Sequence, residues 1–211
     1  MINTVLFFAM LAPWFSDASN IPVVKAGYLE VEAEAYTRQY QNEKRHWYTI
    51  DESSEFEIRE DSHLADASGG AYLELLPDTR VTHGDKLIQG LNFCPEPGRM
   101  AILDYEVQVE EPGRYYIWVR AYSTGSEDNG IHVGLDGSWP ASGQRMQWCA
   151  GKNSWRWDSK QRTKEVHCGE PELIYLDIDT AGKHTISFSM REDGFEFDQW
   201  SMGLAYEQHN N

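Results

Sequence analysis

Apolar and polar residues alternate with a period of two in several segments of the chain beyond its first two dozen residues. Because successive side chains of a β-strand point to opposite faces, this alternation predicts strands that bury one face. Turn sequences such as Glu111-Pro112-Gly113, Asp136-Gly137 and Ala181-Gly182-Lys183 separate the alternating segments. The predicted strands cover residues 29–35, 71–75, 103–109, 115–121, 131–135, 173–178, 186–190 and 195–202.

The last predicted strand changes phase part of the way along its length. Phe195 and Phe197 share one parity, whereas Trp200 and Met202 share the other. One extra residue in a strand produces such a slip, so we predict a β-bulge near Asp198-Gln199. The sequence shows no convincing amphipathic helix, internal repeat or heptad. The pattern therefore predicts an all-β fold, namely an antiparallel β-sandwich of the jelly-roll type.

An apolar run over residues 5–12 lies close to the N-terminus and is too short to span a bilayer. The small residues Ser16 and Ala18 follow it and are typical of a signal-peptidase site, while a buried apolar strand is the alternative interpretation. We expect a signal peptide over 1–18 and a secreted, periplasmic or cell-surface protein. A chain of 211 residues suffices for one domain. We place this domain at 28–206, after a linker at 19–27 and before a tail at 207–211.

The chain carries a net charge of −16, from 34 Asp and Glu residues against 18 Lys and Arg residues. This charge predicts a soluble chain that nucleic acid repels. No membrane partner is expected, and we expect a monomer. Between Arg145 and Lys164, however, six basic residues and one acidic residue give a net charge of +5, which leaves −21 for the remainder. This basic window is either a solvated loop or an opening for an anionic ligand.

The chain contains three cysteines, Cys94, Cys149 and Cys168. In an exported protein, Cys149 and Cys168 are candidates for a disulfide. Cys94 would then be left over, and we expect it to be a buried thiol. Since no two cysteines have the CxxC spacing, a zinc site is not expected.

Residues 137–168 form the longest irregular stretch and carry four tryptophans. Tryptophan and tyrosine rings stack on the C–H faces of sugars, and polar side chains nearby bind the hydroxyls. We therefore predict a carbohydrate site near this stretch, in which Trp155 and Trp157 share one face of an extended segment. The candidate residues are Trp139, Trp148, Trp155, Trp157, Tyr122, Asn129, Arg191, Glu192 and Asp193.

Tyr116, Trp118, Arg120 and Tyr122 also share one parity on a predicted strand. This row either belongs to the binding surface or forms a second packed layer beneath a loop. For Trp118 we favour the packed layer.

Glu32 and Glu34 are two residues apart in a predicted strand, so both carboxylates are expected on the same face. Two such charges repel unless a proton or a cation lies between them. Calcium prefers several oxygen ligands, and Asp198 at the predicted bulge is a candidate for a third carboxylate. A solvated acidic edge is the alternative interpretation.

Five segments, which together run from about Tyr28 to Met202, carry recognisable motifs. The segments are Val31-Glu32-Ala33-Glu34-Ala35-Tyr36, Ser68-Gly69-Gly70-Ala71-Tyr72-Leu73, 109–121 with its Pro112-Gly113-Arg114-Tyr115, Thr180-Ala181-Gly182-Lys183-His184-Thr185-Ile186, and Gly194-Phe195-Glu196-Phe197-Asp198-Gln199-Trp200. They resemble carbohydrate-binding modules of families six and thirty-five. The resemblance implies a galactose-binding-domain-like β-sandwich.

The resemblance also implies a structural calcium that joins the first and last strands. The glutamates and the aspartate of the family carry over to Glu32, Glu34 and Asp198, and carbonyls near Ser68 and Gly70 complete the shell. A tryptophan of the long loop, here Trp155 or Trp157, usually stacks on the sugar.

The chain departs from the family pattern in its long loop, which has two cysteines, and in Arg191-Glu192-Asp193, which replaces an asparagine. These departures leave the identity of the glycan open. The ending Asp-Gly-Phe-Glu-Phe-Asp resembles that of modules attached to polysaccharide-degrading enzymes of marine bacteria.

The resulting prediction is a non-catalytic module that recognises a polysaccharide or oligosaccharide. A small jelly-roll glycosidase or lyase is the main alternative, with Glu74, Glu192 and Glu196 as candidate carboxylates. A surface adhesion sandwich without a glycan ligand is the third interpretation.

Overall fold

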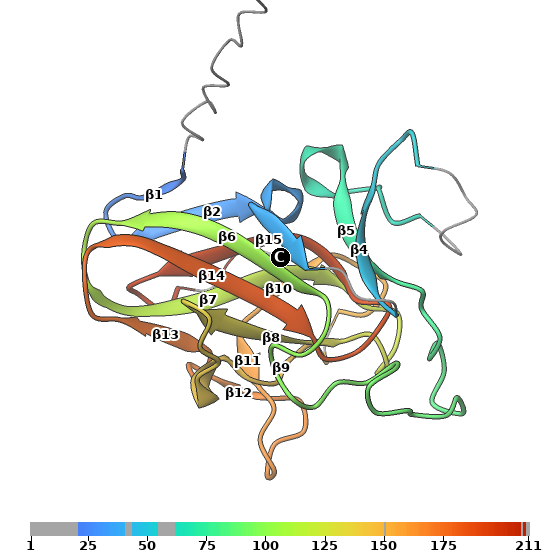
Figure 1. Ribbon diagram of the computed structural model, residues 1–211. Helices are drawn as coiled ribbons and strands as arrows, with labels where there is room; N and C mark the ends of the chain where they lie inside the picture. The colour runs from blue at the N-terminus through green and yellow to red at the C-terminus, as the bar shows by residue number, and fades with distance from the viewer. Residues whose placement is uncertain (1–20, 41–43, 55–61, 150, 208, 210–211) are drawn as a thin grey trace, which may run out of the picture.

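The computed structural model describes residues 21–40, 44–54, 62–149, 151–207 and 209, and in this part of the chain two β-sheets form a sandwich (Figure 1). The first sheet contains β1 (Val23–Val24), β3 (Arg38–Tyr40), β6 (Ile102–Val109), β8 (Gly130–Leu135), β9 (Met146–Gln147), β11 (Lys160–Gln161), β12 (Glu170–Pro171) and β14 (Gly182–Met190). The second contains β2 (Tyr28–Glu32), β4 (His46–Ile50), β5 (Tyr72–Leu76), β7 (Gly113–Tyr122), β10 (Arg156–Asp158), β13 (Tyr175–Ile178) and β15 (Glu196–Gly203).

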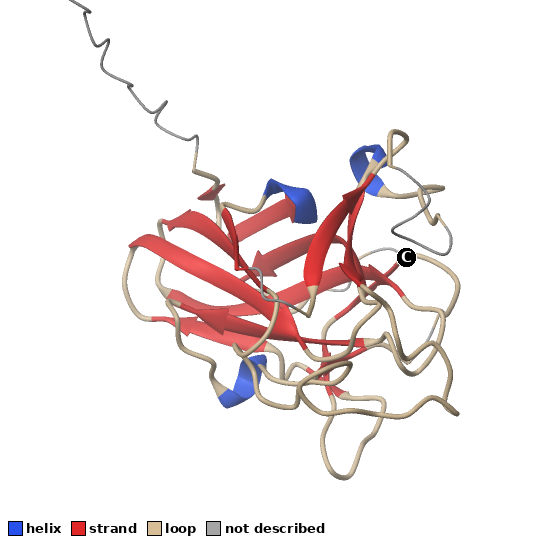
Figure 2. Ribbon diagram, turned by 45° about the vertical axis from the view of Figure 1, so that its right-hand side comes forward, coloured by secondary structure: helices blue, strands red, loops and turns tan. Residues whose placement is uncertain are grey.

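Helical structure in the described residues is confined to short 3-10 turns, which Figure 2 shows in blue at the ends of the strands. These turns are η1 (Ala33–Ala35), η3 (Ser68–Gly70) and η4 (Ala141–Gly143). None of the helices in the described part of the chain is long and apolar enough to cross a bilayer. The predicted all-β sandwich is therefore confirmed.

The strand order of the first sheet is β1-β6-β14-β8-β9-β11-β12, and β3 also pairs with β6. The second sheet follows the order β10-β7-β15-β5-β4, while β13 pairs with β7 and β2 pairs with β15. The pairings are antiparallel apart from the short parallel contact of β1 with β6. The first and last long strands of the second sheet thus lie side by side.

The core fills the space between the two sheets with the inward residues of each alternating strand. In β7 these are Tyr115, Ile117, Val119 and Ala121, all of which are buried. Aromatic rings from both sheets meet edge to face, which adds to the stabilisation from apolar burial. The rings include Trp47, Tyr105, Phe188, Phe195, Phe197 and Trp200.

The predicted bulge is present in β15. Phe197 pairs with Ala121, and Gln199 pairs with the adjacent Arg120, so Asp198 is the extra residue. The carboxyl group of Asp198 is fully buried. The bulge therefore directs an acidic side chain to a defined position at the start of the last strand.

The structure corrects several predicted boundaries. The strand predicted over 29–35 ends at Glu32, because the chain turns into η1, so Glu34 leaves the strand that carries Glu32. Val23–Val24, which lies in the predicted linker, pairs with β6 as part of the first sheet. In the predicted tail, the His209 ring stacks on Trp157 with 4.1 Å between ring centroids. The predicted signal peptide over 1–18 lies outside the described residues.

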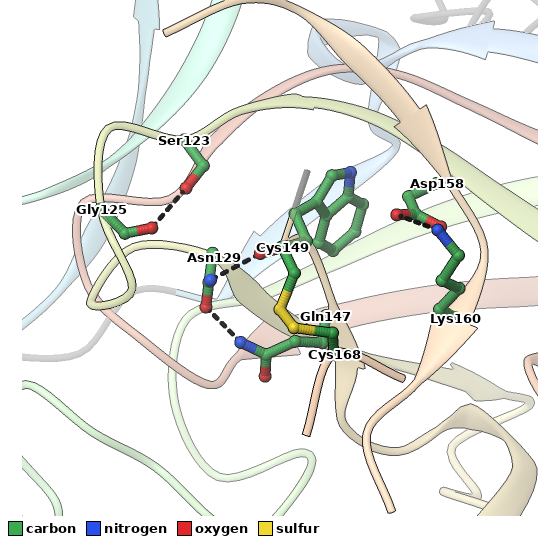
Figure 3. Close-up of a disulfide and its surroundings, with 9 residues drawn as sticks. Ser123, Gly125, Asn129, Gln147, Cys149, Asp158, Lys160 and Cys168 are labelled. Carbon is green, nitrogen blue, oxygen red and sulfur yellow. Dashed lines mark hydrogen bonds and ion pairs between the residues drawn. A yellow bond between two sulfur atoms is a disulfide. The ribbon is translucent and has the colours of Figure 1, made fainter. Parts of the chain in front are cut away.

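The stretch 137–168 is less irregular than its sequence pattern predicts. It contains η4, β9, β10 and β11, and β10 pairs with the end of β7. Cys149 and Cys168 are joined by a disulfide, whereas Cys94 is a buried free thiol. Figure 3 shows the disulfide beside Asn129 and Gln147. This cross-link closes the tryptophan-rich segment into a loop on the sandwich.

Candidate functional site

An acidic cluster lies where β2, η3 and the bulge of β15 meet. The Ser68 backbone N–H donates to Asp198 Oδ1 at 2.8 Å, and the Ser68 hydroxyl donates to Glu32 Oε1 at 2.8 Å. The left-handed backbone at Gly69 (φ 62°) and Gly70 (φ 78°) lets the chain wrap closely around these carboxylates. A Cβ added at Gly69 would lie 3.7 Å from Glu34 Oε1. The structure thus brings together the acidic residues that the sequence nominated from opposite ends of the chain.

The cluster holds more negative charge than its hydrogen bonds satisfy. Glu32 Oε2 and Glu34 Oε2 are buried without a hydrogen-bond partner. Burial, together with the charges of Glu32 and Asp198, raises the pKa of the Glu34 carboxyl to about 7. A carboxylate oxygen without a donor in a buried place is costly, so these two atoms mark a position that suits a proton or a cation.

Asp198 itself is already paired in the structure. The Arg120 guanidinium forms an ion pair with Asp198 Oδ2 and also donates to the Asp66 carbonyl at 3.0 Å. Within the described residues, no three His, Cys, Asp or Glu side chains are arranged closely enough to form a metal site. The fit to a hard cation therefore rests on the two unpaired oxygens of Glu32 and Glu34, which are the donor type that calcium prefers.

A cavity of about 470 Å³ lies next to the acidic cluster, and Arg120 borders both. Its volume is within the range of small-molecule sites, and it combines aromatic with polar groups. Its walls come from the end of β7, the start of β10, the loop before β10 and the segment before η3. The lining residues are Ser62, His63, Ala65, Asp66, Arg120, Tyr122, Asn153, Ser154, Trp155 and Arg156.

Trp155 and Tyr122 form the aromatic wall of this cavity. The two rings meet edge to face with 5.5 Å between centroids, and the Trp155 indole N–H donates to the His63 carbonyl at 2.9 Å. The Tyr122 ring stacks on His63 at 3.8 Å, and His63 Nδ1 lies 2.8 Å from Glu196 Oε1. Trp155 is only 6% exposed, so packing holds its ring in one orientation. A rigid aromatic wall with polar neighbours suits a ring-shaped polar ligand.

The other candidate tryptophans lie elsewhere. Trp157 packs against His209, and Trp148 lies in the core against Phe195. Trp139 packs over a glycine, because a Cβ at Gly98 would lie 2.2 Å from its indole nitrogen. Of the four tryptophans of the long stretch, the cavity next to the acidic cluster includes Trp155.

The polar candidates Asn129, Arg191, Glu192 and Asp193 are buried, and their side chains are held by hydrogen bonds and ion pairs within the protein. Asp193 accepts hydrogen bonds from Arg45 at 2.6 Å and from the Thr79 backbone at 2.9 Å. Glu192 accepts from Arg191 and from the Asn129 backbone. The Asn129 side chain bonds the Trp148 carbonyl and Gln147, as Figure 3 shows for the Gln147 contact. These groups brace the loops and do not line the cavity.

Sequence reasoning did not single out His63, Asp66, Asn153 or Arg156 as cavity residues. Nothing local in the sequence marks them, since they lie in loops or on a three-residue strand. The sequence did indicate that Arg120 lies on the same strand face as Tyr122, because the two residues are two positions apart on β7. Trp118 of the same row packs under Tyr206 with 4.9 Å between centroids, as the packed-layer interpretation predicted.

The three carboxylates that the sequence suggested as catalytic groups of an enzyme, Glu74, Glu192 and Glu196, lie in two different places. Glu74 and Glu196 lie directly opposite each other on β5 and β15, and both are buried. Glu192 belongs to the separate loop cluster with Arg191. Neither Glu74 nor Glu196 lines the cavity, although Glu196 contacts His63 on its wall.

No protein-family model matches the chain. Uncharacterized protein P23 of Formosa agariphila is 54% identical to it over 179 residues, which make up 83% of this chain and 43% of that protein. The chain therefore spans less than half the length of this curated relative.

Solved structures that resemble the chain include carbohydrate-binding modules of family 35. The module from Clostridium thermocellum has a TM-score of 0.49 at 12% identity, over 85% of this chain and 100% of that one. The module from Paenibacillus barcinonensis has a TM-score of 0.49 at 10% identity, over 84% of this chain and 99% of that one.

Proposed function

We propose that the chain is a non-catalytic carbohydrate-binding module and that the cavity lined by Trp155 and Tyr122 receives the sugar. The observation that carries this proposal is the convergence of two rigid aromatic rings with Arg120, Asn153 and Arg156 around one cavity. The aromatic rings supply apolar surface for the C–H faces of a pyranose. The polar groups supply donors and acceptors for its hydroxyls.

The resemblance of the sequence motifs to families six and thirty-five supports the same function. It implies that a tryptophan of the long loop stacks on the sugar, and Trp155 is the member of that loop that borders the cavity next to the acidic cluster. The proposed ligand is a polysaccharide or oligosaccharide. We further propose that the protein is exported and acts outside the cytoplasm as a monomer.

We also propose a structural calcium ion held by Glu32 and Glu34. Their unpaired carboxylate oxygens support it, and backbone carbonyls near Ser68 and Gly70, with Asp198, are the remaining candidate ligands. The ion would neutralise two carboxylates that otherwise repel each other. Since Glu32 lies on β2 and Asp198 on β15, calcium would link the first and last strands of the second sheet.

Alanine substitution of Trp155, with Trp157→Ala as the matched control, tests the sugar site. The two tryptophans have the same chemistry and nearly the same exposure, 6% and 9%, but Trp157 packs on His209 outside the cavity. In affinity gels and calorimetry with plant and algal glycans, we expect Trp155→Ala to weaken binding at least tenfold and Trp157→Ala to change it less than threefold. Equal effects of both variants would contradict the proposed site.

The enzyme interpretation is the second candidate, because Glu196 contacts His63 on the cavity wall and lies opposite Glu74. The purified protein should be incubated with the same glycans and assayed for new reducing ends and unsaturated uronates. We expect neither product. Release of either one at turnover rates, lost in Glu196→Gln, would replace the module by an enzyme.

A further inference from the structure

Three arginines gather on the first sheet at the ends of β14, β9 and β11. Met146 pairs with Ile131 on one side and with Gln161 on the other, so the adjacent Arg145 lies between His132 and Arg162. Hydrogen bonds fix this register. The Arg145 backbone N–H donates to His132 Nδ1 at 3.1 Å, and the Arg162 N–H donates to the Arg145 carbonyl at 2.9 Å.

Arg191 reaches the same place from the end of β14. Met190 pairs with Ile131, so Arg191 follows the strand next to Gly130. A Cβ at Gly130 would lie 2.5 Å from Arg191 Nη1, so the absent side chain makes room for the guanidinium. The ring of Phe93 supports the Arg191 guanidinium at 5.2 Å.

One carboxylate, Glu192, offsets one of these three positive charges. Glu192 is paired with Arg191 and with the Asn129 backbone. Among the described residues, the guanidiniums of Arg145 and Arg162 have no hydrogen-bond or ion-pair partner, and Arg162 Nε is buried without one. In a chain with a net charge of −16, cations left without acidic partners are unexpected.

The titration behaviour agrees with this arrangement. Burial and the charges of Arg191 and Arg145 lower the pKa of Arg162, and Glu192 opposes them. The pKa of the exposed His167 is lowered chiefly by the charge of Arg162, with Arg191 and Arg145 contributing. His132 remains neutral because burial lowers its pKa to about 4. Beside the ion pair of Arg191 with Glu192, Arg145 and Arg162 leave the cluster with an excess of positive charge.

We propose that Arg145 and Arg162, with the buried Arg191–Glu192 pair next to them and His167 at their edge, form a site for the sulfate ester or carboxylate groups of an acidic polysaccharide. Guanidinium groups bind both anions through paired N–H donors, and an anion between Arg145 and Arg162 would relieve their repulsion. This inference rests on the proposed carbohydrate-binding function and names its substrate class. The disulfide-closed segment supplies Trp155 to the cavity and Arg162 and His167 to the cluster, so one loop builds both sites.

The test compares matched charged and neutral polysaccharides. The probes are ι-carrageenan with its desulfated form, and polygalacturonate with its carboxyl-reduced form. The double variant Arg145→Gln/Arg162→Gln is compared with Lys25→Gln/Lys183→Gln, which removes the same charge near the opposite end of β14. We expect the parent to prefer at least one charged member, with binding that weakens as sodium chloride is added. The arginine variant should lose at least tenfold in affinity for it, and the lysine variant less than threefold.

Thermal melts at low salt show whether the arginine variant is folded. Because like charges are removed, its midpoint should equal or exceed that of the parent. Sulfated and carboxylated probes decide which anion is recognised. Equal binding of charged and neutral members, or an arginine variant that binds like the parent, would overturn the inference and leave the module intact if Trp155→Ala still abolishes binding. Failure of the parent to bind any glycan would overturn the proposed function together with this inference.

Discussion

Glu34 is the residue whose protonation connects the acidic cluster to stability. Its carboxyl is half-buried next to Glu32 and Asp198, and its pKa is raised to about 7. A proton or a cation at this position therefore relieves repulsion that the folded chain imposes. The unfolded chain separates the same carboxyl from its neighbours, so pH and calcium act on the folding equilibrium through this group.

In the presence of a chelator, the protonated Glu34 carboxyl should contribute fully to the free energy of unfolding below about pH 4.5. This contribution should be lost as the pH rises through about 7. The native state keeps a proton there that the unfolded state releases. Calcium should raise the melting temperature more at pH 8 than at pH 5, because it binds the ionised carboxylates. Calorimetric melts with calcium and with chelator measure both effects.

Glu34→Gln should remove most of the pH dependence between 5 and 8 and weaken the response to calcium. Glu30→Gln is the matched control, since Glu30 is exposed on β2, outside the acidic cluster, and accepts a hydrogen bond from the Tyr28 hydroxyl. Melts of the parent that are unchanged by calcium at pH 8 would contradict the proposed ion site.

At the scale of elements, the segment closed by Cys149 and Cys168 carries the candidate sugar contacts. Its strand β10 pairs with the end of β7, which brings Trp155 next to Tyr122. The cross-link restricts the unfolded chain over a sequence separation of 19 residues. Closing a loop of about this length contributes about 3 kcal/mol to stability.

Cys149→Ser/Cys168→Ser should therefore lower the free energy of unfolding by about 3 kcal/mol in urea titrations. It should also weaken glycan binding, because Trp155 and Arg156 lie inside the loop. Cys94→Ser serves as the control, since that thiol is not in the disulfide. An unfolding free energy equal to that of the parent would show that the cross-link does not stabilise the segment.

Strands with several alternating residues were predictable from the sequence, as β6, β7, β8 and β14 illustrate. The two-residue strands β1, β9, β11 and β12 were not, because two residues carry no period and their pairing depends on distant strands. The turn at η1 was missed because Val-Glu-Ala-Glu continues to alternate where the backbone turns. The buried carbonyl of Ala33 instead accepts a hydrogen bond from Tyr105, a partner far away in the sequence.

The candidate site was predictable only in part. The motifs resembling a known family identified Glu32, Glu34 and Asp198, which the structure brings close together. Periodicity could not distinguish Trp155 from Trp157, because both lie in the same short segment. The structure distinguishes them, because His209 packs on Trp157 while Trp155 lines the cavity. The contact between His209 and Trp157 joins residues 52 positions apart, so local sequence could not reveal it.

At the scale of the whole molecule, a rigid sandwich carries a strongly acidic surface charge and one basic region. The basic window of +5 against −21 elsewhere corresponds in part to the arginine cluster of Arg145 and Arg162. Such a charge distribution orients an anionic polymer toward one region of the surface. The two sheets share one aromatic core, so the loops that carry the cavity and the cluster are attached to a scaffold of fixed geometry.

The most direct measurement of the sugar site is an NMR titration of the tryptophan indole N–H signals with an oligosaccharide of the bound glycan. Substituting single tryptophans by phenylalanine assigns the signals of the 8 tryptophans. We expect the Trp155 signal to shift most in a saturable manner, while the core residues Trp148 and Trp200 stay unchanged. A saturable shift centred on Trp118 or Trp157, with Trp155 unaffected, would contradict the assignment of the cavity as the carbohydrate site.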